Sequence, residues 1–496
     1  MTIAFPKPDE AVLARRKEIV EGLGRLVASE ALIVSEDERR AFETDGLTSY
    51  RQIPLAVVLP STTEEVSAIM RFCNDHGVKV VPRGAGTSLC GGAIPQADAI
   101  VLGVAKMNRV LDVNFEGRTA RVQSGITNLG ISQAVAHEGF FYAPDPSSQL
   151  ACTIAGNIAM NSGGAHCLKY GVTTNNLLGV TMVLLDGTVV EIGGEHLDAA
   201  GYDLLGLVCG SEGQLGVVTE AVVRILRAAE GARPALFGFG SVEAAGACVA
   251  AIIGAGIIPV ALEYMDKPAI QICEAFAHAG YPLDVEAMLI VEVEGSDAEI
   301  DDMLRRIVTI AEPFKPKTMK VSQSEAESAA IWKGRKSAFG ATGRVADYIC
   351  MDGTIPTGQL PYVLNRIDEI VKSYGLAVAN VFHAGDGNLH PLICYDEKIA
   401  GQSDLAAQVG AEILQYCIDA GGSLTGEHGI GADKAEYMPK MFSDDDLDVM
   451  LTVRRAFDPK GLCNPGKVFP MPRLCGEVPG PYHAHPLEKA GLAERF

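Results

Sequence analysis

Apolar side chains recur every three or four residues between positions 62 and 76, and this spacing predicts an amphipathic helix. Ser61 and Glu64 have capping-box spacing at the start of the segment, and Gly77 follows its end. Short apolar runs further along the chain have the lengths of β-strands rather than helices. The hydrophobic pattern therefore predicts a mixed chain in which helices and strands alternate.

Strands are predicted at 78–81, 99–104 and 119–125, where β-branched and other apolar residues cluster. Between 180 and 194, Asp186-Gly187 separates two β-branched runs, which is typical of a β-hairpin. The longest uncharged run, 244–262, approaches the roughly 20 residues that span a bilayer. Three glycines and one proline interrupt it, so we expect a buried helix followed by a strand.

A second hairpin is predicted at 378–393, with Asp386-Gly387 as a two-residue turn. This register places His383 opposite His390, with their Cβ atoms about 4.5–5.5 Å apart on one face. Two imidazoles at that spacing can share one metal ion. The alternative is that both are core residues at the ends of a tight loop, with Asp386 hydrogen-bonded to either ring.

A predicted helix at 405–420 ends at Gly421-Gly422 and leads into SLTGEHGIG (423–431). Glu427 adds a carboxylate to the two histidines, and His428 is its neighbour. If the segment is extended, these two side chains point to opposite faces. One would then bind a metal while the other faces a substrate.

The length of 496 residues predicts more than one domain. A polar, Pro-containing stretch after Arg227 indicates a junction, and the Pro/Gly-rich segment 456–470 is suited to return to the first domain. We therefore predict domains at residues 1–228, 229–431 and 432–496.

Charge and cysteine content exclude several classes of function. The formal net charge is −21 and no cluster of Lys and Arg stands out, which disfavours nucleic acid as a partner. The first residues lack the apolar core of a secretory signal, so we expect a cytoplasmic protein. The 12 cysteines have no CxxC spacing, so we expect no iron–sulfur cluster on this chain. An electron relay beyond one cofactor would therefore lie on another protein.

The glycine-rich loop PRGAGTSLCGG (82–92) does not match the dinucleotide fingerprint, because Leu89 stands where a third glycine is needed. It is followed in order by APDPSSQLACTIAGNIAMNSGG (143–164), KYG (169–171) and GSEGQLGVVT (210–219). This ordered set resembles the FAD-binding domain of the vanillyl-alcohol oxidase/p-cresol methylhydroxylase superfamily.

The resemblance runs from DGLTSYR (45–51) to NPGKVFP (464–470). Within the superfamily the chain looks like the FAD-linked oxidases that include the flavin subunit of bacterial glycolate oxidase and the D-lactate and D-2-hydroxyglutarate dehydrogenases. The implied fold class is α+β: a two-part FAD-binding domain of the p-cresol methylhydroxylase type, and an α/β cap or substrate domain with an antiparallel sheet.

The resemblance also implies which residues hold FAD. They lie in the glycine-rich loops, beside the flavin and around the ribose and adenine: Arg83, Gly84, Ala85, Gly86, Thr87, Ser88, Pro144, Ser147, Ser148, Thr153, Gly156, Asn157, Gly163, Gly164, Glu212, Gly213, Val217, Val218 and Asn464. The loop has no histidine that could attach FAD covalently, so we expect a dissociable cofactor.

In the 2-hydroxyacid dehydrogenases of this family, the residues that match His383, His390 and Glu427 bind a divalent cation, zinc or manganese. The residue that matches His428 is the base, and the one that matches Arg335 binds the substrate carboxylate. Lys333, Lys336 and Arg344 are nearby alternatives for that contact. Relatives that act on D-2-hydroxyglutarate carry a lysine shortly before Asp352, where this chain has Cys350 and Met351. This difference favours a small monocarboxylate.

The resemblance therefore implies FAD-dependent oxidation of a small 2-hydroxy acid, glycolate and also D-lactate, to the 2-oxo acid. Electrons would pass to an iron–sulfur subunit and the quinone pool, in a complex with a second flavin-type subunit. Any membrane contact, peripheral to the inner membrane, would come only through that complex. The alternatives are a D-2-hydroxyglutarate dehydrogenase, an aryl-alcohol oxidase that needs no metal, and a non-catalytic flavoprotein subunit.

Overall fold

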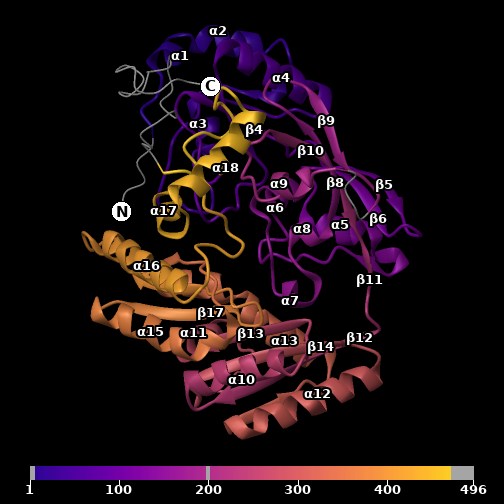
Figure 1. Cartoon of the computed structure of the whole chain (residues 1–496), viewed down its shortest axis with the longest axis vertical. Coiled ribbons are helices and arrows are strands. Elements are labelled where there is room, and N and C mark those ends of the chain that lie inside the picture. The colour runs from indigo at the N-terminus through magenta and orange to yellow at the C-terminus, as the bar shows by residue number, and fades with distance from the viewer. Residues whose placement is uncertain (1–5, 197–200, 471–496) are drawn as a thin grey trace.

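Three large sheets organise this computed structural model, which describes residues 6–196 and 201–470. The four- and five-stranded sheets lie in the upper half of Figure 1, and the seven-stranded sheet lies in the lower half. Helix α18 (Asp444–Phe457), near the end of the described chain, lies in the upper half again (Figure 1). The chain thus enters the lower body once and returns from it.

The four-stranded sheet has the order β1-β2-β4-β3. Its strands β2, β4 and β3 are parallel, and β1 is antiparallel to β2. The bounds are β1 (Leu32–Ile33), β2 (Ala56–Val58), β3 (Lys79–Arg83) and β4 (Ala99–Gly103). The N-terminal helices of this body are α1 (Glu10–Ala14), α2 (Arg16–Leu23), α3 (Glu36–Arg39) and α4 (Thr63–His76).

Helix α4 is the helix predicted at 62–76, and Gly77 ends it in a left-handed conformation (φ 66°), as expected. The predicted cap is wrong by one residue. Thr62, not Ser61, accepts a hydrogen bond from the backbone of Glu65. The Glu65 carboxylate accepts one in return from the backbone N–H of Ser61. Both positions carry hydroxyls, so the sequence alone did not distinguish them.

The five-stranded sheet is antiparallel, with the order β5-β6-β10-β8-β9. Its strands are β5 (Val110–Asn114), β6 (Thr119–Gln123), β8 (Leu177–Val183), β9 (Val189–Gly193) and β10 (Val217–Arg224). Strands β8 and β9 form the hairpin predicted at 180–194, with Gly187 in the turn at φ 83°.

Short elements connect these strands and carry the loops that matter for function. The helices are α5 (Asn128–Val135), α6 (Ile154–Met160), α7 (Cys167–Tyr170), α8 (Thr173–Asn176) and α9 (Leu204–Val208). Strands β7 (Phe140–Phe141) and β11 (Leu226–Arg227) pair with one another just before the chain leaves this body.

The seven-stranded sheet is antiparallel throughout, with the order β15-β12-β14-β13-β17-β18-β16. The bounds are β12 (Gly231–Phe239), β13 (Ala261–Asp266), β14 (Ala287–Gly295), β15 (Thr318–Val321), β16 (Asp347–Cys350), β17 (Ala377–His383) and β18 (Pro391–Tyr395).

Helices cover both faces of this sheet, which explains its nearly continuous apolar strands. Phe237 packs in the core under α10 (Val242–Gly254), α12 (Asp297–Ala311), α15 (Leu360–Ser373) and α16 (Gln402–Asp419). Its neighbour Leu236 packs in the opposite core with α11 (Lys267–Ala277), α13 (Glu325–Lys336) and α14 (Ala338–Val345).

The uncharged run at 244–262 forms most of α10 and the start of β13, so the predicted helix followed by a strand is confirmed. Within the described ranges no helix combines the length and the hydrophobicity that crossing a bilayer requires. The run is apolar because α10 is pressed between the sheet and neighbouring helices.

After α17 (Met438–Met441) and α18, the chain lies against β3 of the first body. Cys463 forms a parallel bridge with Val80, and the backbone of Asn464 donates to the carbonyl of Val80 at 2.8 Å. The predicted C-terminal segment extends to 496, and its part from 471 lies outside the described residues. The boundaries at 228 and 431 stay predictions.

Candidate active site

The hairpin that carries the two histidines forms, but its predicted register is wrong. Asn380 pairs with Pro391, and His383 forms a bridge with Asn388, so His390 is not directly opposite His383. The loop is longer than expected, because the N–H groups of Asp386 and Asn388 both donate to the carbonyl of His383 at 3.3 Å. The shift is two residues, and a shift of two keeps a side chain on the same face.

The two imidazoles therefore still meet, as diagonal neighbours with ring centroids 5.2 Å apart. Both side chains are buried, with relative exposures of 6% for His383 and 2% for His390. Glu427 Oε1 lies 3.3 Å from Nε2 of His383 and 3.4 Å from Nε2 of His390. Two histidines and one carboxylate thus converge from the hairpin and from the loop after α16.

These three residues fit a divalent cation. Among the described atoms, both ring nitrogens of His390 are buried without a hydrogen-bond partner. Burial by itself would raise the pKa of Glu427, but His383 and His390 lower it to about 2, so the carboxylate is ionised. An orphaned imidazole and an ionised carboxylate are the donors that zinc and manganese take.

Glu263, on β13, fixes the orientation of His383. Its Oε1 lies 2.8 Å from Nδ1 of the imidazole, so the ring presents Nε2 to Glu427. The other oxygen, Oε2, accepts from Nε and Nη2 of Arg335 at 2.9 and 2.6 Å. Glu263 and Arg335 are buried, at 0% and 4% exposure. Sequence reasoning missed Glu263; the available signal was a carboxylate inside the apolar run of a buried strand.

The loop 425–428 is bent rather than extended, so the condition under which Glu427 and His428 would point to opposite faces is not met. The His428 ring stacks on His390 at 4.8 Å, and Glu427 contacts the same histidine. Burial is the main cause that lowers the pKa of His428 to about 4. The ring is therefore neutral near pH 7 and can accept a proton.

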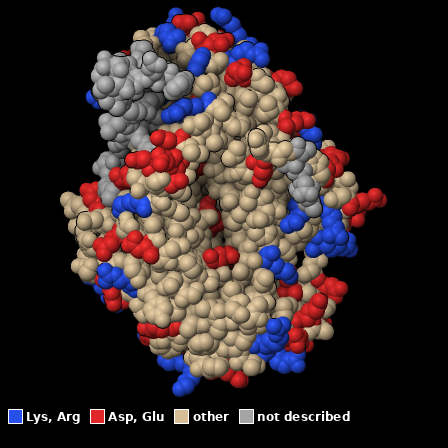
Figure 2. Space-filling view, viewed as in Figure 1, with Lys and Arg blue, Asp and Glu red and all other residues tan. Residues whose placement is uncertain are grey.

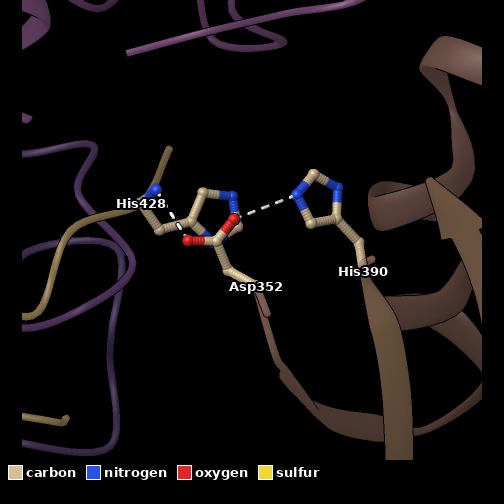
Figure 3. A group of neighbouring side chains, drawn as sticks. All are labelled: Asp352, His390 and His428. Atoms are coloured by element: carbon tan, nitrogen blue, oxygen red, sulfur yellow. Dashed lines mark hydrogen bonds and ion pairs between the residues drawn. The ribbon is translucent and has the colours of Figure 1, made fainter. Parts of the chain in front are cut away.

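Asp352 contacts both His390 and His428 (Figure 3). Its Oδ1 is 3.4 Å from Nε2 of His390, and its Oδ2 accepts from the backbone N–H of His428 at 2.9 Å. Asp352, His390 and His428 form a second group whose donor atoms lie close enough to hold an ion. Sequence analysis used Asp352 only as a motif position and assigned it no role in the site.

A cavity of about 400 Å³ connects this cluster to the glycine-rich loops. On the face shown in Figure 2 the surface is hollowed between the two bodies, with acidic side chains at its edge. Most of the predicted FAD residues line the cavity: Arg83, Gly84, Ala85, Gly86, Thr87, Ser88, Ser147, Ser148, Thr153, Gly156, Asn157, Glu212, Gly213, Val217, Val218 and Asn464. His390, Glu427 and His428 line it as well.

Three predicted FAD residues lie behind the cavity wall instead. The carbonyl of Pro144 accepts from the side chain of Asn128 at 3.0 Å. The N–H of Gly163 donates to Glu427 Oε2 at 3.0 Å, so this glycine holds the ion site. A Cβ on Gly164 would lie 2.4 Å from the carbonyl oxygen of Asp145. These glycines are needed for contacts within the protein.

Two of the lining residues use their charged groups elsewhere. The Glu212 carboxylate accepts from the N–H groups of Ile430 and Gly431 at 2.6 and 2.7 Å, one on each oxygen. The Arg83 guanidinium donates to the carbonyl of Thr44 at 2.7 Å. Both residues therefore shape the cavity through the backbone around it.

The wall next to His390 includes Lys336, Phe339 and Tyr348. The Phe339 ring lies 6.2 Å from that of His390 and 6.3 Å from that of Tyr348. Arg335, predicted to contact the substrate, does not line the cavity and is bonded to Glu263. Lys336, which sequence reasoning kept only as an alternative, is the cation of this wall.

A partly buried ion cluster connects the two bodies beside the cavity. His166 Nδ1 lies 3.1 Å from Asp145, and its Nε2 lies 3.4 Å from Glu292 on β14. Burial by itself would lower the pKa of His166, but the two carboxylates raise it to about 10. The indole N–H of Trp332 also donates to Glu292, at 2.8 Å.

Comparison with known proteins gives two family matches. Residues 54–193 match a model described as a FAD binding domain. Residues 229–468 match a model described as FAD linked oxidases, C-terminal domain. The FAD prediction is confirmed by these matches, which cover the loops at 82–92 and 143–171 and the histidine cluster.

Relatives extend the match to almost the whole chain. Glycolate oxidase subunit GlcD of Escherichia coli (strain K12) is 47% identical over 484 residues, which cover 97% of this chain and 95% of that protein. D-lactate dehydrogenase of Archaeoglobus fulgidus is 32% identical, with 87% of this chain and 95% of that protein covered.

A solved structure of p-cresol methylhydroxylase superposes with a TM-score of 0.79 at 13% identity, covering 94% of this chain and 98% of that one. At this identity the likeness concerns the fold alone, and it confirms the predicted fold class. Because nearly half of its residues are identical to a GlcD subunit over almost the full length of both, the chain is a flavoprotein of the FAD-linked oxidase family.

Proposed function

We propose that the chain oxidises a small 2-hydroxy acid, glycolate and also D-lactate, to the 2-oxo acid with FAD as the electron acceptor. The observation that carries this proposal is the place of His428, a neutral base next to the His383–His390–Glu427 group at one end of the cavity. The names of the relatives, glycolate oxidase subunit and D-lactate dehydrogenase, support the same substrate class.

The chemistry divides between the cofactors and the chain. Bound FAD supplies the two-electron acceptor, for which no side chain can substitute. A divalent cation held by His383, His390 and Glu427 supplies Lewis-acid stabilisation of a substrate oxygen. His428 takes the hydroxyl proton on its imidazole, since its lowered pKa keeps the ring neutral near pH 7. Gly163 and Glu263 hold the carboxylate and the imidazole of the ion site in place.

Two positively charged side chains are candidates for binding the substrate carboxylate. Arg335 is the residue that the family resemblance indicates, but its Nε and Nη2 are occupied by Glu263. Lys336 follows it in α13 and lines the cavity. We assign the first contact with the anionic substrate to Lys336, and to Arg335 the task of holding Glu263 against His383.

The residues just before Asp352 favour a monocarboxylate over D-2-hydroxyglutarate. Cys350 and Met351 carry no charge, and the buried Lys434 nearby donates to Asp352 and to the carbonyl of Gly429. The ion-site residues argue against an aryl-alcohol oxidase, which needs no metal. A non-catalytic subunit would have little reason to keep His428 in contact with that site.

Electrons leave the dissociable FAD for an iron–sulfur subunit in our proposal, because the cysteines of this chain have no cluster spacing. The GlcD relatives are named subunits of glycolate oxidase, and we propose a comparable complex with a second flavin-type subunit. The protein would be cytoplasmic and reach the quinone pool, peripheral to the inner membrane, through that complex. The domains 1–228, 229–431 and 432–496 belong to the same proposal.

The deciding experiment is turnover of the purified, flavin-loaded chain with a dye acceptor and glycolate, D-lactate or D-2-hydroxyglutarate. We expect the two monocarboxylates to be turned over faster than the dicarboxylate. Equal or faster turnover of D-2-hydroxyglutarate would overturn the substrate assignment. Failure to take up FAD, seen as no absorbance near 450 nm, would contradict the cofactor itself.

A further inference from the structure

Asp352 is a buried carboxylate directly behind the candidate ion site. It follows strand β16 by two residues and is 0% exposed. An ionised group at such depth is costly unless donors surround it. The donors that surround Asp352 come almost entirely from one loop, the loop that carries Glu427 and His428.

Four consecutive residues of this loop donate to the Asp352 carboxylate. The Thr425 hydroxyl donates to Oδ2, and so do the backbone N–H groups of Gly426 at 3.1 Å and His428 at 2.9 Å. The N–H of Glu427 lies 3.3 Å from both oxygens. Successive N–H groups that converge on one anion form a concave backbone turn, so the position of Asp352 sets the shape of the loop.

Lys434 fixes the carboxylate from the other side. Its Nζ lies 3.4 Å from Asp352 Oδ2 and 3.2 Å from the carbonyl of Gly429, and the side chain is 2% exposed. The lysine therefore joins the end of β16 to the end of the same loop. The Thr425 hydroxyl closes the turn, because it also accepts from the N–H of Gly429 at 2.9 Å.

Asp352 has few free lone pairs for an ion of its own. Its Oδ2 already receives donors from the loop and from Lys434, whereas Glu427 Oε1 faces only the two histidines. Asp352 Oδ1 lies 3.4 Å from His390 Nε2 (Figure 3). Glu427 Oε1 lies at the same distance from that nitrogen. The geometry thus suits Asp352 to orienting residues of the ion site rather than to replacing Glu427 in it.

We propose that Asp352, held by Lys434, is the positioning residue of the active site: it shapes the loop 425–428 so that Glu427 meets His383 and His390 while His428 stacks on His390. This inference rests on the ion site of the proposed function. Asp352 thereby positions both the third metal ligand, Glu427, and the base, His428.

The test is the affinity of the metal-free, folded protein for Zn²⁺ and Mn²⁺, measured by competition with a chromophoric chelator. We expect Asp352→Asn to weaken binding by about 10- to 100-fold, the usual loss when a residue that supports a ligand is removed. The matched control is Asp98→Asn. Asp98 is also 0% exposed and pairs with a buried lysine, Lys79, at 2.8 Å, but it lies on the four-stranded sheet side of the molecule. Asp98→Asn should lower the melting temperature and leave metal affinity unchanged.

A second variant, Thr425→Val, removes one donor to Asp352 and touches no predicted ligand. We expect it to weaken metal binding by about 10-fold, as the loss of one hydrogen bond to a charged group would. It decides the question if Asp352→Asn does not fold. Loss of affinity in Asp352→Asn with wild-type affinity in Thr425→Val would identify Asp352 as a direct ligand and overturn the positioning role.

Wild-type affinity in both variants would likewise show that the loop does not depend on Asp352. If the wild-type protein itself binds neither ion, the ion site of the proposed function is wrong, and this inference is wrong with it. That result is distinguishable, because it appears before any variant is made.

Discussion

Glu263 accepts a hydrogen bond from His383 at 2.8 Å while its second oxygen accepts two from Arg335, so one buried carboxylate orients the imidazole and neutralises the guanidinium. We expect Glu263→Gln to weaken metal binding by about 10- to 100-fold, because the amide has only one acceptor oxygen where Glu263 serves both His383 and Arg335. It should also destabilise the protein by about 3–5 kcal/mol, since Arg335 is left buried without its partner.

Metal content and denaturant unfolding measure the two effects separately. Glu286→Gln is the control, because Glu286 pairs with Lys267 at 2.7 Å on the surface and should change stability by no more than about 0.5 kcal/mol. Unchanged metal affinity in Glu263→Gln would contradict the role given to this carboxylate.

His428 is expected to act as the base. Replacing it with Gln should lower kcat by roughly 10²- to 10⁴-fold, the contribution typical of a positioned proton acceptor. FAD content should not change, and metal affinity should fall much less than in a His383 variant, since His428 stacks on His390 and is not one of the three proposed ligands. A dye-coupled assay measures kcat, and flavin absorbance serves as the control for FAD content. A kcat of the variant within 3-fold of wild type (roughly 0.7 kcal/mol) would exclude His428 as the base.

Much of the fold follows from local sequence patterns. The spacing of apolar residues predicts helix α4, the β8–β9 hairpin and the α10–β13 pair, each within its own segment. Glycines such as Gly77 and Gly187 mark where these elements end or turn. The cap of α4 and the register of β17–β18 were mispredicted, because neighbouring hydroxyls and alternative loop lengths satisfy the same local rules. The β17–β18 error still kept both histidines on one face, since it was a shift of two residues.

Site residues that belong to a sequence motif could be predicted. Residues that reach the site only through contacts between distant parts of the chain could not. His383, His390 and Glu427 converge as expected although the residues are far apart in sequence. Glu263 and Asp352 were not identified, because each acts only through partners brought together by the sheet: strand β13 lies beside β17, and β16 beside β18. The local sequence marks Glu263 as a carboxylate in an apolar strand and Asp352 as a motif position, but it does not show which partners they contact.

Gly84 tests the glycine-rich loop. A Cβ at this position would lie 2.2 Å from Oγ1 of Thr153, the hydroxyl that caps α6 by accepting from the N–H of Gly156. We expect Gly84→Ala to displace the loop and reduce FAD affinity at least about 10-fold, or about 1.4 kcal/mol. Gly340→Ala is the control, because a Cβ there meets no atom within 4 Å and alanine favours the helix. Flavin retention after gel filtration measures the difference, and equal retention would contradict the prediction.

The His166 cluster makes stability depend on pH. Asp145 and Glu292 raise the folded-state pKa of His166 to about 10, above the unfolded value of about 6.5. The stabilisation is therefore complete below pH 6.5 and is lost as pH rises towards 10. We expect His166→Gln to cost about 1.5–3 kcal/mol at pH 6 and progressively less at pH 8 and 9.5. A difference between variant and wild type that stays constant or grows with pH would show that the ring is not charged in the folded protein.

Lys336 is expected to attract the substrate carboxylate, because it is the lysine of the cavity wall, whereas Lys333 on the same helix does not line it. Lys336→Met should raise KM for glycolate about 5-fold with little change in kcat, which corresponds to about 1 kcal/mol for an exposed ion pair. Lys333→Met, which removes a similar charge one turn away, should leave both constants unchanged. The effect should also shrink as salt is added, because an exposed charge is screened. The opposite outcome is that Lys336→Met behaves as wild type, while Arg335→Lys raises KM and keeps its metal content. Arg335 would then bind the substrate carboxylate, and its guanidinium would have to leave Glu263 when substrate binds.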